Sequence, residues 1–315
     1  MSVRGTDTRT RKARISHRYN LRESVAGFAF ITPWIIGFLI FTVISMLWSL
    51  RLSFQNYDLA TGIGTFTGMD NYRQLVSDPL VRKSLGNTIL YALMAVPADV
   101  IFALLLALLL NGQRRATGFF RTIYYLPKMT PSVATASVFL LLLNGNQGAI
   151  NKFLGFFGIR GPQWLIDPKW VKVSIVIMTL WAVGGTMVIL LAALQNVPIE
   201  LYEASEVDGA GRWSQFYHVT LPMISPTLFF LVITNTIAAL QVFDSAYLLF
   251  YRDGVSSAPQ AALFYGVYLY QQAFQQFNFG FAASLAWLLF VLIMLISLIQ
   301  MVVGNRLVFY GGAEQ

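Results

Sequence analysis

Residues 85–110 read LGNTILYALMAVPADVIFALLLALLL, and in this stretch of 26 residues Asp99 is the one charged side chain. A helix that crosses the hydrocarbon core of a bilayer needs about 20 consecutive, predominantly apolar residues. The stretch is long enough to cross, and Asn111-Gly112 follows it as a typical helix-ending pair. It therefore predicts a membrane-spanning helix, and the rest of the chain repeats its pattern.

Five further apolar runs have a similar length, at residues 25–50, 119–143, 170–194, 221–249 and 280–303. Of the 315 residues, 56% are hydrophobic and 11% are charged, and the mean hydropathy is +0.61. A soluble domain carries about 25% charged residues. We therefore predict an all-α polytopic membrane protein with six transmembrane helices, of which the third is kinked at Pro127 and Pro131. One membrane domain, residues 25–305, lies between a basic tail at 1–24 and a short tail at 306–315.

The distribution of basic residues predicts which side the loops occupy. The 1–24 tail holds seven Lys and Arg residues, and we assign six more to the same side: Arg114, Arg115, Arg121, Lys128, Arg212 and Arg306. These thirteen of the 22 basic residues favour cytoplasmic termini by the positive-inside rule. A basic stretch before an apolar run also occurs in secretory signals, but residues 25–50 are too long for one. We predict a multi-pass protein of the cell (inner) membrane, with its tail near anionic lipid rather than nucleic acid.

Residues 197–222 read VPIELYEASEVDGAGRWSQFYHVTLP and are polar, between the fourth and fifth apolar runs. Pro198 is favoured in a first helical turn, and the acidic residues that follow it complement the helix dipole. Gly209 and Gly211 permit the backbone to turn, and a second short helix is expected from residue 212 to 219. We therefore predict a helix-turn-helix. On physical grounds alone, the segment is equally well explained as a solvated amphipathic connector between two spans.

This segment resembles the EAA loop of permease subunits of binding-protein-dependent ABC importers. The family pattern is matched by Glu203-Ala204-Ser205, Asp208-Gly209-Ala210 and Leu221-Pro222, with Ser205 where alanine is commoner. The resemblance implies a type I importer permease fold, with a cytoplasmic coupling helix between spans four and five that docks on an ATPase. The residues that it assigns to this coupling are Glu203, Ala204, Asp208, Gly209, Ala210, Arg212, Leu221 and Pro222.

Other stretches resemble the carbohydrate-uptake permeases, including those for maltose and glycerol-3-phosphate. They are residues 66–72 (FTGMDNY), Asp78-Pro79, Gly86-Asn87-Thr88 and residues 240–244 (LQVFD). The resemblance implies half of a sugar pathway, with a second related permease subunit, an ATPase homodimer and an extracytoplasmic sugar-binding protein as partners. Because the chain lacks G-x-x-x-x-G-K-[ST], ATP and Mg belong to the partner ATPase, and we expect no enzyme activity, cofactor or metal on this chain.

Polar residues inside the apolar runs are the candidates for the substrate path, because buried polar groups in membranes tend to face the interior. A sugar needs hydrogen-bonding groups and a flat aromatic surface, and the candidates supply both: Asn235, Gln241, Asp244, Tyr247, Trp181, Thr179, Gly184, Thr135 and Ser137. Thr186 lies in the same run as Thr179. Each has a structural alternative, either a hydrogen bond to its own helix or a contact between helices, and the Gly184-Gly185 pair marks close packing. For Asp99 we expect a partner across a subunit interface.

Two other classes of protein stay open from the residues alone. An ion-coupled secondary transporter needs acidic residues in several spans, whereas only Asp99 and Asp244 are present. An integral membrane enzyme needs a cluster of His or carboxylates on one side, and the sequence has two His residues and no Cys. A permease for glycerol-3-phosphate or a related polar solute is the nearer alternative to a sugar permease.

Overall fold

The computed structural model describes residues 21–58, 62–112, 117–251 and 259–308. The basic tail up to residue 20, the loop positions Arg114 and Arg115, and the tail from residue 309 lie outside the described residues. The chain divides into two compact units, one up to Arg51 and one from Leu52 onward, and each is described by itself.

The first unit is one apolar helical rod. It consists of α1 (Leu21–Phe38), a π-helical turn η1 (Leu39–Ile44) and α2 (Ser45–Leu52). Residues 26–52 are long and apolar enough to cross a membrane, and none of their most apolar window is buried by the rest of the chain. The first predicted span is therefore a helix whose large side chains, such as Phe30 and Phe41, are exposed.

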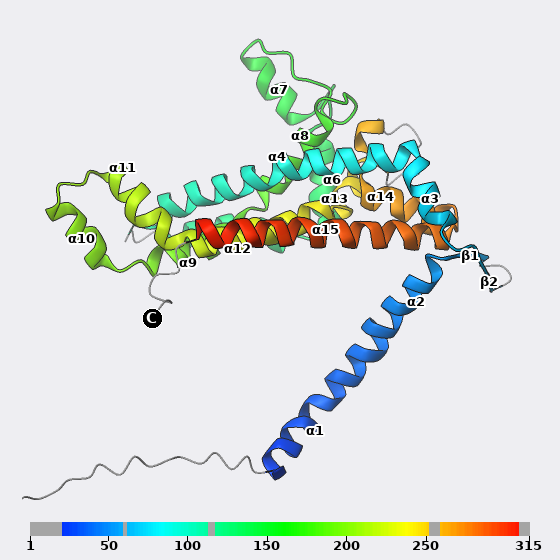
Figure 1. Cartoon of the computed structure of the whole chain (residues 1–315). Coiled ribbons are helices and arrows are strands. Elements are labelled where there is room, and N and C mark those ends of the chain that lie inside the picture. The colour runs from blue at the N-terminus through cyan, green and yellow to red at the C-terminus, as the bar shows by residue number, and fades with distance from the viewer. Residues whose placement is uncertain (1–20, 59–61, 113–116, 252–258, 309–315) are drawn as a thin grey trace, which may run out of the picture. The chain divides into compact units, whose positions relative to one another are not determined.

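Three long helices form the frame of the second unit. They are α4 (Pro79–Leu110), α15 (Phe279–Leu307), and α12 (Leu221–Leu240), which packs against both of them. Figure 1 shows them side by side, with α10 and α11 at one end of the bundle and α3, β1 and β2 at the other. The helix α4 begins six residues before the predicted span, because Asp78 caps it by accepting a hydrogen bond from the Leu80 amide at 2.7 Å and Pro79 occupies its first turn.

Two predicted spans are broken rather than continuous, which corrects the single helices expected at 119–143 and 170–194. The first consists of α5 (Thr117–Tyr125), the 3₁₀ turn η2 (Leu126–Met129) and α6 (Ser132–Leu142). The break falls where Pro127 and Pro131 remove amide donors from the helix. The second consists of α8 (Val171–Trp181) and α9 (Gly184–Gln195), whose axes differ by 52°.

The fifth predicted span is extended at its beginning and interrupted near its end. The short helix α11 (Arg212–Gln215) and the π-helical turn η3 (Phe216–Thr220) run directly into α12, so the second helix expected at 212–219 is present but continues into the fifth span. After residues 241–243 the chain resumes as α13 (Asp244–Phe250). Among the described residues, four helices are long and apolar enough to cross a membrane, or five if the bent pair α8–α9 is one span.

Short elements close the end of the bundle away from α10. A hairpin of β1 (Gln55–Asp58) and β2 (Ile63–Phe66), antiparallel with Gln55 opposite Phe66, leads to α3 (Asp70–Ser77). Between α6 and α8 lies α7 (Ala149–Phe156), and η4 (Gln260–Ala262) precedes α14 (Tyr265–Tyr270) and the π-helical turn η5 (Gln271–Gln275).

Residues 251–279 are aromatic and polar, a composition that suits an interfacial helix, but α14 is buried instead. Its residues Tyr265 and Tyr268 are buried, and the Tyr265 hydroxyl donates to the Leu285 carbonyl at 2.9 Å. Burial, together with a hydrogen bond to the Asp78 carboxylate, raises the pKa of Tyr268, so its phenol stays protonated and donates. Asn87 of α4 holds the preceding segment by donating to the Gln260 and Leu263 carbonyls, each at 2.9 Å. Residues 261–268 are thus part of the core, whereas Phe274 and Phe277 are exposed.

Gly184 lies at the bend between α8 and α9 because no larger residue fits there. A Cβ at this position would lie 2.2 Å from the Tyr124 carbonyl oxygen of α5, whereas a Cβ at Gly185 would have the Lys128 Cε as its nearest neighbour, at 3.9 Å. The close helix packing expected at Gly184 is confirmed.

We predict that Gly184→Ala destabilises the protein by about 1–3 kcal/mol, because backbone must move to admit the methyl group. Gly185→Ala is the matched control and should leave stability unchanged. The measurement is thermal unfolding of the detergent-solubilised protein, and equal melting temperatures for the two variants would contradict the packing described.

Candidate functional site

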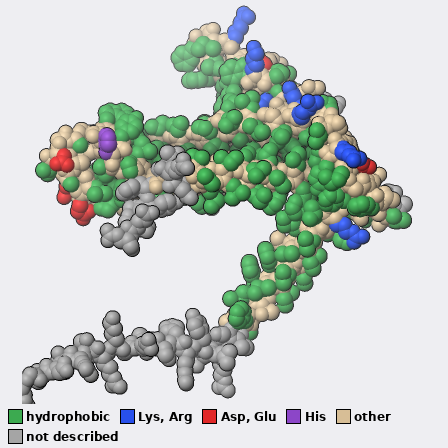
Figure 2. Space-filling model, in the orientation of Figure 1, with side chains coloured by type: hydrophobic (Ala, Val, Ile, Leu, Met, Phe, Trp, Pro, Cys, Tyr) green, Lys and Arg blue, Asp and Glu red, His purple; other side chains and the backbone are tan. Residues whose placement is uncertain are grey.

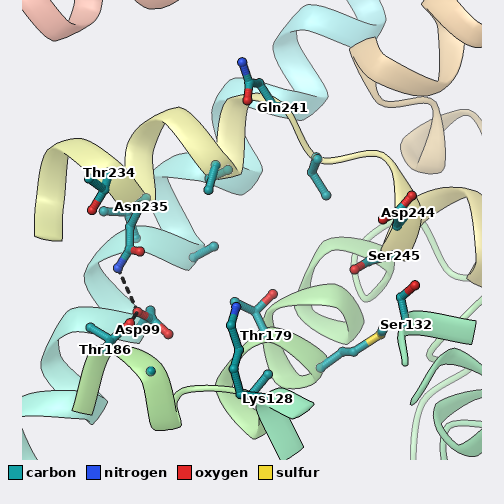
Figure 3. Close-up of a pocket in the computed structure, with 18 of the residues that line it drawn as sticks. Asp99, Lys128, Ser132, Thr179, Thr186, Thr234, Asn235, Gln241, Asp244 and Ser245 are labelled. Atoms are coloured by element: carbon teal, nitrogen blue, oxygen red, sulfur yellow. Dashed lines mark hydrogen bonds between the residues drawn. The ribbon is translucent and has the colours of Figure 1, made fainter. Parts of the chain in front are cut away.

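A cavity of about 860 Å³ lies in the second unit where the broken helices meet. Its walls come from α4, the η2–α6 connection, the α8–α9 bend, and the α12–α13 interruption. Figure 3 shows side chains from these elements arranged around it. Since helix breaks leave backbone groups without helical partners, they occur in membranes where the backbone lines a cavity. The breaks thus mark the cavity wall.

Asp99 of α4 is the most enclosed charged group of this wall, with 7% of its surface exposed. Its Oδ2 atom accepts hydrogen bonds from Thr186 Oγ1 of α9 and from Asn235 Nδ2 of α12, both at 2.8 Å (Figure 3). The donors lie in its own chain, because α9 and α12 both pack against α4. A further partner of Asp99 across a subunit interface stays a prediction.

Lys128 is the only Lys or Arg among the described residues that line the cavity. It lies in η2, between Pro127 and the start of α6. It therefore lies in the cavity wall, beyond the nine residues of α5 that follow the loop at 113–116, rather than in that loop. The side of the membrane to which the basic residues belong stays a prediction.

Five of the nine predicted path residues line the cavity: Thr135, Thr179, Asn235, Gln241 and Asp244. They lie on four different helices or helix ends, so the fold brings together positions that are more than 100 residues apart in sequence. The Thr179 hydroxyl lies 3.0 Å from the Tyr91 hydroxyl and also donates to the Ile175 carbonyl of its own helix. The Gln241 side chain has no hydrogen-bond partner within the described part of the chain and is exposed to the cavity.

The other four predicted residues lie elsewhere. Tyr247 stacks on Phe243 with ring centroids 5.3 Å apart, and Trp181 meets the Phe139 ring edge-on at 5.7 Å. Ser137 donates to the Val133 carbonyl of its own helix, as the structural alternative predicted. Gly184 contacts Tyr124 rather than the cavity.

Six polar residues of the wall were missed by the sequence reasoning: Tyr91, Lys128, Thr130, Ser132, Thr234 and Ser245. A signal for Lys128 existed, because a charged residue inside a predicted span is a candidate functional group. Ser132 follows Pro131 at the start of α6, and Ser245 lies in the first turn of α13. Both therefore lie at helix breaks; the kink at Pro127 and Pro131 was predicted, whereas the interruption between α12 and α13 was not.

The predicted coupling segment consists of α10 (Ile199–Val207), a turn, and α11. Gly209 has φ of +79°, a left-handed conformation that favours glycine, so the helix ends where the motif predicts. The Tyr202 hydroxyl lies 2.9 Å from Thr220 Oγ1, and Gln215 Nε2 donates to Ser205 Oγ at 3.1 Å. Ser205, the departure from the family pattern, therefore joins α10 to α11, and the Tyr202–Thr220 contact joins α10 to the turn before α12.

The surface of this segment is acidic and aromatic. Glu203 and Glu206 are exposed, as are Trp213, at 76%, and Tyr217, whose ring stacks with that of Trp213 at 6.3 Å. Figure 2 shows acidic side chains gathered at this end of the molecule. Trp213 and Tyr217 form an exposed aromatic patch of the kind that marks interaction sites.

A helical bundle with a polar cavity between broken spans, and with a rigid, exposed helix pair at one end, has the architecture of an ABC importer permease. Residues 99–308 match the family described as binding-protein-dependent transport system inner membrane component, and the chain belongs to this family. It is thus a membrane transport subunit, as the EAA-loop resemblance predicted. Family membership favours a transport subunit over a membrane enzyme.

Relatives cover almost the whole chain. The Probable ABC transporter permease protein YesP of Bacillus subtilis (strain 168) is 37% identical over 93% of this chain and 95% of its own length. The lactose transport system permease protein LacF of Rhizobium radiobacter is 34% identical, over 88% of this chain and 93% of its own. The resemblance to carbohydrate-uptake permeases is confirmed.

A solved structure has the same fold. A chain of a bacterial ABC transporter for the acidic polysaccharide alginate superposes with a TM-score of 0.79, covering 91% of this chain and 97% of that chain. The two chains are 24% identical, so the likeness shows the fold alone.

We predict that Thr186→Val lowers stability by roughly 1–3 kcal/mol, because the enclosed Asp99 carboxylate loses one of two donors. Thr130→Val is the isosteric control in the same cavity, since the Thr130 hydroxyl has no partner within the described residues. Unfolding of the two purified variants by heat tests this, and a Thr186→Val protein that melts with the wild type would contradict it.

Proposed function

We propose that this chain is the permease subunit of an ATP-driven sugar importer and forms half of its translocation pathway. The observation that carries the proposal is the cavity at the helix breaks, where hydroxyl, amide and carboxylate groups lie beside apolar side chains. A sugar presents hydroxyls that both donate and accept, and such a wall offers partners of both kinds. Relatives named for the transport of lactose and arabinooligosaccharides support a sugar as the solute.

The other components of the importer are expected to be separate protein chains. A second, related permease subunit completes the pathway, an ATPase homodimer binds ATP and Mg, and an extracytoplasmic binding protein delivers the sugar. A solved relative of this fold is described in complex with an alginate pentasaccharide-bound periplasmic protein, which supports the last of these. We further propose six spans, counting α1–α2 as the first and α5–α6 as the third, with both termini in the cytoplasm.

Coupling to the ATPase follows from how α10 is attached. The contacts Tyr202–Thr220 and Ser205–Gln215 tie α10 to the turn before α12 and to α11, so a push on α10 moves α12 with it. From Thr220 to Asn235 the helix is about 22 Å long at 1.5 Å per residue. Because Asn235 donates a hydrogen bond to Asp99, a displacement of α12 would also move Asp99 at the cavity. Alternating exposure of the cavity would follow from this movement of one half against the other.

A second candidate solute has a specific observation in its favour. Lys128 places a cation in the cavity wall, which suits glycerol-3-phosphate or another anionic polar solute. Competition by such a solute for sugar uptake distinguishes the two candidates.

We predict that Glu203→Lys abolishes uptake while the membrane subunits still assemble, because the exposed acid belongs to the surface that docks on the ATPase. Glu200→Lys, an exposed acid of the same helix outside the motif, is the control and should retain transport. Uptake of radiolabelled sugar, alongside co-purification of the ATPase, is the measurement. Normal accumulation by a well-expressed Glu203→Lys complex would contradict the proposal.

We predict that Gln241→Leu raises the apparent KM for uptake by roughly tenfold, the equivalent of about 1.4 kcal/mol, through the loss of one hydrogen bond to the sugar. Asn235→Leu should also raise the KM, but this change has two effects, since the Asn235 amide also donates a hydrogen bond to Asp99. Thr234→Val is the control, because this hydroxyl donates to the Phe230 carbonyl of its own helix. If neither Gln241→Leu nor Asn235→Leu changes the KM, the sister subunit holds the sugar.

A further inference from the structure

The segment between α6 and α8 exposes an apolar surface that the proposed transport cycle does not use. Its members are here called the α7 patch: Phe153, Phe156, Phe157, Ile159 and Ile166. Each is more than half exposed, and Phe156 reaches 88%. On the other side of the same helix, Ile150 and Leu154 pack against the core. The helix is therefore anchored through one face and presents a second apolar face outward.

Side-chain hydrogen bonds hold the loop that carries the α7 patch in a defined conformation. Asn151 Nδ2 donates to the Gly145 carbonyl at 2.7 Å and to the Pro162 carbonyl at 3.1 Å, and Asn151 Oδ1 accepts from Trp164 Nε1 at 2.7 Å. After the helix the chain reverses at Gly158, whose φ of +73° favours glycine. These contacts hold both ends of the loop together around α7, so the exposed phenylalanines are a fixed feature of the surface.

Basic residues surround the patch. Lys152, Arg160 and Lys169 are exposed, and Asp167 is the one acidic residue between 144 and 170. The Asp167 carboxylate is already engaged, since its Oδ1 accepts from the Lys169 amide at 3.0 Å. Figure 2 shows basic side chains beside the apolar atoms of this part of the molecule. An apolar helix face with a basic border is the composition of segments that bind anionic membrane surfaces.

We propose that the α7 patch binds the lipid bilayer, with its phenylalanines among the acyl chains and with Lys152 and Arg160 at the phosphates of anionic phospholipids. The segment is tied on both sides to membrane helices, α6 and α8, which keeps it close to the bilayer. Exposed apolar side chains also continue from the patch onto α6, where Leu141 is 76% exposed. Lipid binding here would fix the position of α6 and α8, which both line the cavity.

The absence of cysteine from the chain makes a single-cysteine test direct. Phe156→Cys, in the full chain with its co-purifying subunits, is labelled with an environment-sensitive dye and placed in nanodiscs of phosphatidylcholine and phosphatidylglycerol. Nitroxide-labelled lipid should quench this dye several-fold more than aqueous iodide does. Val76→Cys is the control, an 80% exposed apolar position on α3, another eight-residue helix, and there iodide should dominate. Ile159→Cys gives a second position in the patch if Phe156→Cys does not assemble.

Charge is tested in the same system. Quenching of the Phe156→Cys dye by lipid should fall when phosphatidylglycerol is replaced by phosphatidylcholine, and the variant with Lys152→Gln and Arg160→Gln should lose this dependence. Arg73→Gln, which changes a basic residue of α3, should keep it. The proposal is overturned if iodide quenches the Phe156 and Val76 positions equally, if neither quencher reaches Phe156 because a protein partner covers it, or if quenching does not respond to phosphatidylglycerol.

Discussion

A single buried carboxylate organises the second unit. Asp99 Oδ2 takes hydrogen bonds from α9 and α12 while its own backbone belongs to α4. Burial of a charge without partners is very costly in an apolar environment, and two short hydrogen bonds offset part of this cost. The two hydrogen bonds therefore hold the three helices in one relative position. The cavity exists on one side of this junction because the helices that meet there are broken.

The breaks and the junction depend on each other. At the α8–α9 bend the chain approaches the backbone of α5 so closely that only Gly184 fits, and two residues later Thr186 reaches Asp99. Had α8 and α9 formed one straight helix, the 52° change of direction would be absent and Thr186 would lie elsewhere. The interruption after α12 likewise turns Gln241, Asp244 and Ser245 toward the cavity. In these spans, the breaks in the helices thus lie at the cavity, where polar groups can contact a solute.

Hydropathy predicts where helices cross a bilayer, and it located the apolar runs well. It carries no information on where a run breaks: the kink at Pro127 and Pro131 was predicted from the prolines, whereas the bend at Gly184 depends on the approach of α5 and was not predicted. The same limit explains α14, whose aromatic residues look interfacial until Asn87 and Asp78 supply partners to this segment from distant parts of the chain. The coupling segment was predicted better, since its helix end depends on local backbone at Gly209. Among the site residues at the breaks, Gln241 and Asp244 were predicted because they are polar and lie inside an apolar run, whereas Ser132 and Ser245 were missed.

Not every polar group of the cavity can serve a solute. Thr234 donates to carbonyls of its own helix, and Asn235 donates to Asp99. The groups that remain available include Gln241, with donors and acceptors, and Lys128, which only donates. These two lie on opposite connections, one after α12 and one before α6. A solute that bridged both would link α12 to the broken α5–α6 segment. In the proposed mechanism, where α10 moves α12, rotation of α12 would therefore change the distance between Gln241 and Lys128.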